Sequence, residues 1–113
     1  MSKIRPKPEW QVEKDNSELA YNIDSELRQV MDPELGLNVM ELGLIRDVNV
    51  MVDAAHIIMI MTTPFCPYAP ALLESTRAAV EKVVELPTTI EMGMEIWDPT
   101  FMEEGTGSDW GLF

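Results

Sequence analysis

The single cysteine of the chain, Cys66, is the residue best suited to chemistry. It directly precedes Pro67, and proline is favoured at the first position of a helix, so we expect Cys66 at or within a turn of a helix N-terminus. The unpaired amides and the dipole of such a terminus favour an anion, which lowers the pKa of a thiol and populates the thiolate that attacks electrophiles and binds metal. The alternative is a small buried apolar side chain, and the residues alone leave both interpretations open.

Two threonines and two carboxylates are the other candidates. Thr62 and Thr63 end an expected strand shortly before Cys66, and their hydroxyls could hydrogen-bond an anion, a sulfide or the thiolate. Threonine is also common at strand ends and turns for structural reasons. Asp32 and Glu34 lie in a proline–glycine turn after an expected helix, where the helix dipole disfavours negative charge. They either ligate a metal with Cys66 or position a partner, or they are solvated acids of a turn.

A zinc site built from four cysteine and histidine ligands of one chain is excluded, because the chain has one of each residue. His56 lies in an apolar stretch, and we interpret it as a structural histidine with satisfied hydrogen bonds. A hydrolytic pair of Cys66 and His56 is the weaker alternative. Any chemistry at Cys66 therefore uses carboxylates, hydroxyls, backbone amides or the ligands of a partner.

The hydrophobic spacing predicts the elements that must position these residues. In order they are helix, strand, strand, helix and strand, over residues 17–31, 44–52, 56–61, 71–85 and 89–97. Asn16 or Ser17 is the expected cap of the first helix. The second strand is apolar on both faces and should be central, and its two-residue link to the first favours an antiparallel hairpin.

The last expected strand alternates between apolar and polar residues. Its apolar residues, which should share a buried face, are Ile90, Met92, Met94 and Ile96. Glu91, Gly93 and Glu95 should face water. An antiparallel pair followed by a helical crossover to a third strand predicts an α+β fold. We expect a two-layer sandwich of order α-β-β-α-β, with a small mixed sheet and the helices on one face.

Length and charge restrict the class of protein. The chain has 113 residues, which suits one domain, and we expect a flexible leader at 1–15, a domain at 16–101 and an acidic, glycine-rich tail at 102–113. Twenty acidic residues against eight basic ones give a net charge of -12, which disfavours nucleic acid and anionic membranes as partners. Neither a signal peptide nor a transmembrane run is recognisable, so we expect a cytoplasmic protein.

Three motifs in order resemble the SufT/PaaD-like family of iron–sulfur cluster assembly domains. Residues 32–48 read DPELGLNVMELGLIRDV, residues 61–67 read MTTPFCP, and residues 96–99 read IWDP. The resemblance covers about residues 17–101 and implies an α+β fold. It also implies a role in maturing iron–sulfur proteins or, in the PaaD branch, in supporting a multicomponent oxygenase of the phenylacetyl-CoA type.

The site residues that the resemblance implies are Asp32, Glu34, Thr62, Thr63 and Cys66. It further implies a transient iron–sulfur cluster or iron at Cys66, and apo iron–sulfur clients or oxygenase subunits as partners. A cluster commonly takes four ligands, and one chain offers one thiolate, so the others must come from a homodimer, small thiols or a client. We therefore expect an accessory factor, or an adaptor without chemistry, rather than an enzyme; thiol chemistry at Cys66 is the third hypothesis.

The chain departs from the family pattern at its end. Phe101 stands where members usually have a second tryptophan, and residues 102–113 match poorly. Partner contacts that other members make through this tail are therefore not expected to carry over to this chain.

Overall fold

The predicted helices and strands follow one another in the predicted order, and an additional short helix precedes them. A computed structural model describes residues 8–63 and 67–103, so Cys66 lies outside the described residues. The elements of the described part are α1 (Gln11–Asp15), α2 (Ser17–Leu27), β1 (Ile45–Val50), β2 (Ala55–Met59), α3 (Ala69–Val84), β3 (Thr88–Met92) and the 3-10 turn η1 (Pro99–Phe101).

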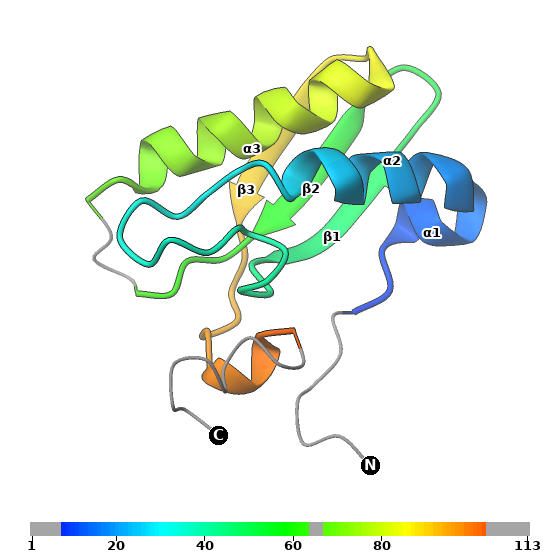
Figure 1. Ribbon diagram of the computed structural model, residues 1–113. Coiled ribbons are helices and arrows are strands. Elements are labelled where there is room, and N and C mark those ends of the chain that lie inside the picture. Colours follow the sequence, from blue (N-terminus) through cyan, green and yellow to red (C-terminus); the bar gives the residue numbers. More distant parts are fainter. Residues whose placement is uncertain (1–7, 64–66, 104–113) are drawn as a thin grey trace.

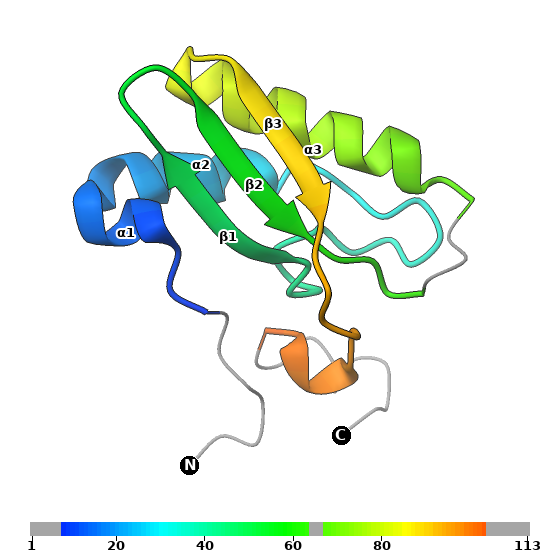
Figure 2. The ribbon, with the colours of Figure 1, turned by 180° about the vertical axis from the view of Figure 1, so that it is seen from behind.

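The three strands form one mixed sheet in the order β1-β2-β3. β1 and β2 are antiparallel, with Val48 opposite Ile57, and β2 and β3 are parallel, with Ile57 opposite Ile90. The crossover from β2 to β3 runs through α3. Figures 1 and 2, seen from opposite sides, show α2 and α3 on one face of the sheet and the other face uncovered. The predicted two-layer α+β sandwich with a central second strand is confirmed.

α2 begins at the predicted residue, Ser17, whereas α3 begins at Ala69, two residues before the predicted start. Asn16 caps α2, because its side-chain oxygen accepts a hydrogen bond of 3.1 Å from the backbone N–H of Leu19. α2 ends at Leu27, earlier than predicted, and the chain then turns so that Met31 pairs with Asn38 in an isolated bridge. α3 carries Pro70, rather than the expected Pro67, in its first turn. It ends at Val84, and its C-cap residue Glu85 has a left-handed φ of 57°.

Residues 10–15 differ from the loose leader that we predicted for 1–15. They form the start of the packed structure: Trp10 and Val12 are each only 1% exposed, and α1 packs against α2 and β1. The indole Nε1 of Trp10 donates to the backbone oxygen of Ile45 at 3.3 Å. The prediction failed because a helix of five residues is too short to show an apolar period.

The third strand is shorter than predicted, and its apolar face is not buried throughout. β3 ends at Met92, and Met94 and Ile96, which we expected inside, are 97% and 88% exposed. The chain bends at Met94 and leaves the sheet. The alternation of apolar and polar residues therefore continues in the sequence beyond the part of the strand that the helices cover. At the other end of this segment, Phe101 and Met102 are buried, so the core extends one residue into the expected tail.

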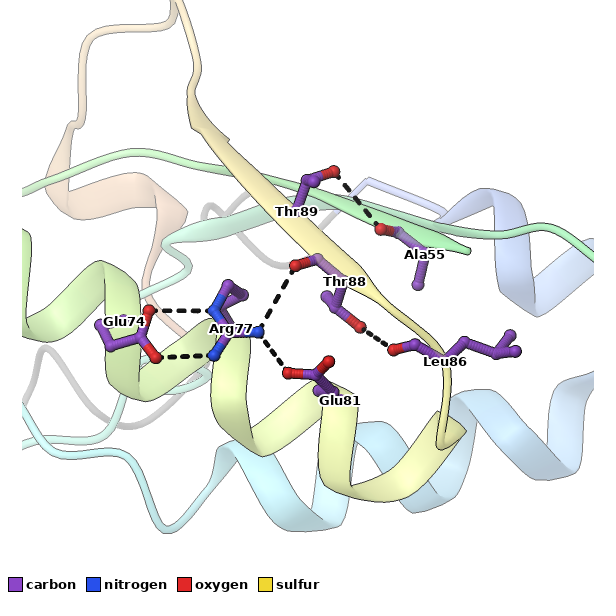
Figure 3. Close-up of polar contacts among 7 residues, drawn as sticks. All are labelled: Ala55, Glu74, Arg77, Glu81, Leu86, Thr88 and Thr89. Carbon is purple, nitrogen blue, oxygen red and sulfur yellow. Dashed lines mark hydrogen bonds and ion pairs between the residues drawn. The ribbon is translucent and has the colours of Figure 1, made fainter. Parts of the chain in front are cut away.

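A polar cluster fixes the start of β3 against α3 (Figure 3). The guanidinium of Arg77 donates to both carboxylate oxygens of Glu74, at 2.9 and 2.7 Å, and also pairs with Glu81. A longer bond of 3.5 Å reaches the backbone oxygen of Thr88.

Across the described residues, no helix is both long and apolar enough to span a membrane.

Candidate functional site

A groove lies between the segment that follows β2 and the segment that follows β3. Its volume is about 390 Å³. The residues that line it are Ile60, Met61, Thr62, Thr63, Met92, Gly93, Glu95, Ile96 and Trp97. Most of them are apolar, and the polar side-chain groups are the two threonine hydroxyls, the carboxylate of Glu95 and the indole N–H of Trp97. Small-molecule and cofactor sites commonly combine a concave apolar surface with a few polar groups in this way.

Thr62 and Thr63 share this groove, so the structure brings two of the predicted site residues together. Both follow β2 and are partly buried. The hydroxyl of Thr62 makes no hydrogen bond within the described part of the chain, so it is available to a bound ligand. Cys66 is three residues further along the sequence, outside the described residues, and its place relative to the groove stays a prediction.

The segment after β3, which forms one wall of the groove, is held by one contact to β1 and one to the loop before β1. The guanidinium of Arg46, itself only 7% exposed, donates to both oxygens of Glu95 at 2.9 and 3.4 Å. It also lies 4.2 Å from the ring centre of Phe101. The indole Nε1 of Trp97 donates to the backbone oxygen of Leu42 at 2.7 Å. Glu95 and Trp97 therefore point toward the protein and fix the wall.

Asp32 is a buried carboxylate that organises the turn after α2. It is 1% exposed, and its Oδ1 accepts from the backbone N–H groups of Glu34 and Leu35 at 2.9 and 3.0 Å. The phenol of Tyr68, the residue before α3, donates to the same carboxylate at 3.0 and 3.2 Å. These bonds satisfy most of its acceptor sites, and they tie the turn to the start of α3.

The structure does not present Asp32 and Glu34 as a carboxylate pair. Asp32 is engaged inside the turn, whereas Glu34 is exposed and lines neither the groove nor the smaller cavity of about 150 Å³ beside Tyr68. No group of three or more acidic, histidine or cysteine residues that could hold a metal exists among residues 8–63 and 67–103. A metal ligand set is therefore not preformed in that part of the chain.

His56 has the structural role that we expected. It lies on the uncovered face of the sheet, where its Nδ1 is 2.7 Å from Thr89 Oγ1 and its Nε2 is 2.6 Å from Glu91 Oε1. Both ring nitrogens thus have partners on β3, and the imidazole cross-links the two parallel strands.

Several residues that shape the site were not selected from the sequence. Tyr68, the residue before α3, was overlooked, because it is 36 positions from Asp32 and no local pattern links the two. The pairing of Arg46 with Glu95 could not have been found, because 49 positions separate these residues. Trp97 did carry a signal, since it belongs to the third of the motifs.

Comparison with known proteins supports one family. Residues 22–91 match the family model described as iron-sulfur cluster assembly protein. The Fe-S protein maturation auxiliary factor YitW of Bacillus subtilis is 36% identical over 87 residues, which cover 76% of this chain and 83% of YitW. The Fe-S protein maturation auxiliary factor SufT of Staphylococcus aureus is 29% identical over 76 residues, which cover 66% of this chain and 84% of that protein.

The fold is also found among solved structures. A domain of unknown function, DUF59, from Bacillus anthracis has a TM-score of 0.77 to this chain at 24% sequence identity. The likeness covers 88% of this chain and 98% of that domain. At this identity the similarity concerns the arrangement of helices and strands.

Proposed function

Because this chain belongs to the iron–sulfur cluster assembly protein family, we propose that it is an accessory factor in the maturation of iron–sulfur proteins. The observation that carries the proposal is the groove: Thr62 and Thr63 both line it, and in the sequence they stand shortly before the only cysteine, Cys66. The cluster, or the iron or sulfide that builds it, is cargo that the protein helps to deliver to a client.

Each predicted site residue has a role in this proposal. Cys66 is the thiolate that ligates iron or handles sulfur, and the hydroxyls of Thr62 and Thr63 hydrogen-bond the sulfide or thiolate. Asp32 acts as a positioning residue, because it holds Tyr68 and with it the start of α3. Glu34, exposed on the same turn, contacts a partner.

The cargo must be shared. A cluster needs about four ligands, and this chain contributes one thiolate, so the client, small thiols or a second copy complete the set. Binding at Cys66 is then weak in the free protein and strengthens when the client supplies its own thiolates. Such incomplete ligation suits a protein that gives its cargo away.

The test is anaerobic transfer of a cluster to an apo iron–sulfur client, followed by visible absorbance. We expect the wild-type protein to accelerate transfer and Cys66→Ser to lose that acceleration. Thr62→Val, which removes a hydroxyl and keeps the shape, should reduce the rate less. Equal rates for wild type and Cys66→Ser would show that the protein does not act through this thiol.

A second candidate is an adaptor without chemistry, including one that supports an oxygenase. The exposed Met94 and Ile96 favour it, since large exposed apolar side chains mark contact surfaces. An adaptor would still pull down its partner with Cys66→Ser and would lose it with Glu34→Lys. The opposite pattern would favour the cluster-handling function.

A further inference from the structure

Resting on the proposed function, we propose that residues 94–97 and the adjoining groove dock the client, and that they take an extended segment rich in apolar and basic side chains. We call residues 94–97 the docking segment. Its side chains, its backbone and the charge around it each point to this kind of occupant.

Successive side chains of the docking segment point alternately toward the protein and toward solvent. Glu95 and Trp97 are held by Arg46 and by the backbone oxygen of Leu42. Met94 and Ile96 therefore point outward, and they are almost fully exposed. Their exposure is built into the anchored conformation, so a partner finds the two apolar side chains already in place, which lowers the entropy cost of binding.

The backbone of the docking segment is unpaired. β3 is an edge strand. At its start, the backbone oxygen of Thr88 accepts a hydrogen bond from the guanidinium of Arg77 (Figure 3). The last ladder-like bond runs from the Gly93 N–H to the Met59 oxygen at 2.8 Å. Beyond it, within the described chain, residues 94–97 make no backbone hydrogen bond. Four consecutive peptide groups beside exposed apolar side chains are a template for an added strand.

The charge of the protein selects a basic partner. The chain carries a net charge of -12. Four of its basic side chains are already paired with carboxylates: Arg28, Arg46, Arg77 and Lys82. Near Met94, Glu91 pairs with His56 and Glu95 pairs with Arg46, yet 62% and 49% of their side-chain surfaces remain in solvent. A second copy would bring like charges together here, whereas lysine or arginine residues of a client would meet opposite charge.

Docking here also serves delivery. Ile96 and Trp97 line the same groove as Thr62 and Thr63, so a client strand on the docking segment lies beside the threonines. The client's cluster-binding residues are thereby kept near Thr62 and Thr63, which stand shortly before Cys66 in the sequence.

The test is binding of a short, end-blocked, fluorescein-labelled peptide of alternating valine and lysine, measured by anisotropy with the full chain. We expect it to bind, and a valine–glutamate peptide and a serine–lysine peptide to bind at least about tenfold more weakly. Amide chemical shifts of the ¹⁵N-labelled protein should change at residues 92–97 and 60–63. Larger changes elsewhere would overturn the assignment.

Matched variants locate the surface. Met94→Ser with Ile96→Ser should weaken the valine–lysine peptide about tenfold, because both apolar contacts are lost. Val52→Ser is the control, since Val52 is 95% exposed and lies in the turn between β1 and β2, away from the groove. Equal affinity for the two variants would overturn the proposal. So would wild-type self-association that the double variant abolishes without any peptide binding, because a second copy would then be the occupant.

The two proposals fail separately. If Cys66→Ser transfers clusters normally while the peptide still binds at 92–97, the thiol function is wrong and the docking surface stands. If transfer requires Cys66 but the peptide does not bind, docking at this surface is wrong and the thiol function stands.

Discussion

Asp32 shows how a carboxylate in a family motif can act by position. Three donors converge on it, and one of them is the phenol of Tyr68 at the start of α3. A buried ionised carboxylate is costly unless its oxygens accept hydrogen bonds, and these donors offset that cost. The turn and the helix start are therefore coupled through one side chain.

Tyr68→Phe tests this coupling. Removing the phenol oxygen should lower the free energy of unfolding by about 1–2 kcal/mol, because a buried charged acceptor loses a donor. Urea unfolding measures the change. Tyr21→Phe is the control, since Tyr21 is 72% exposed and should change stability by less than about 0.5 kcal/mol. Equal small effects of both substitutions would show that the Tyr68–Asp32 bond contributes nothing measurable.

The pair of Glu74 and Arg77 predicts a pH effect. Hydrogen bonds from Arg77 lower the pKa of Glu74 below its ordinary value of 4.5. The folded state thus holds this carboxylate ionised more strongly than the unfolded state does. Its contribution to stability is present above pH 4.5 and is lost as the pH falls through the lower folded-state pKa.

Arg77→Gln should return the Glu74 pKa toward 4.5, which a carboxyl-carbon NMR titration would detect. Lys82→Gln removes a nearby positive charge of α3 that pairs with Glu26 instead, and should leave Glu74 unchanged. An unaltered Glu74 titration in Arg77→Gln would mean that the hydrogen bonds are not maintained in solution.

At the level of elements, the loop before β1, which contains Leu42 and Gly43, supports the groove wall formed by the segment after β3. Gly43 and Gly36 share a φ of +72°, but their surroundings differ. A Cβ at Gly43 would lie 2.0 Å from the backbone oxygen of Phe101, whereas nothing lies within 4 Å of one at Gly36. The close approach at Gly43 packs η1 against this loop.

The two alanine substitutions should therefore differ. Gly36→Ala costs only the left-handed backbone strain, about 1–2 kcal/mol. Gly43→Ala adds a backbone clash and should cost at least about 3 kcal/mol, as measured by urea unfolding. Similar costs for both would mean that η1 does not pack on the loop as described.

Local patterns were sufficient to predict most elements. The period of α3, the cap at Asn16 and the apolar run of β2 all depend on neighbouring residues, and each was confirmed. The alternation of residues 89–97 indicated a strand, but it does not say where the covering helix layer stops. Met94 and Ile96 were consequently placed on the wrong side.

The candidate site was predictable only in part. Thr62 and Thr63 were identified together because they are adjacent in the sequence, and they do share the groove. The groove itself needs segments from both sides of α3, and its wall depends on Arg46 meeting Glu95. Contacts over such separations leave no periodic signal in a single sequence.

At the scale of the whole molecule, the N-terminal turn completes the core. Trp10 is among the largest fully buried side chains, and its indole N–H donates to the backbone oxygen of Ile45 in β1. A shortened chain that begins at the expected domain boundary, residue 16, would lack this side chain and the hydrogen bond that it makes.

Trp10→Ala should lower the free energy of unfolding by about 3–5 kcal/mol, because it leaves a large cavity and removes a hydrogen bond. Chemical denaturation followed by circular dichroism measures it. Tyr21→Ala, at an exposed position of α2, should have a small effect. A cost for Trp10→Ala below about 1 kcal/mol would show that residues 10–15 are a dispensable leader after all.

The parallel pairing of β2 with β3 affects how the protein folds during its synthesis. β1 and β2 join through a short turn, whereas β3 can pair only after the whole of α3 has been made. Pairings between distant parts of a chain form slowly, because the intervening loop must close first. A nascent chain that ends before residue 92 therefore has the threonines but no opposite wall, and the groove exists only on a finished molecule.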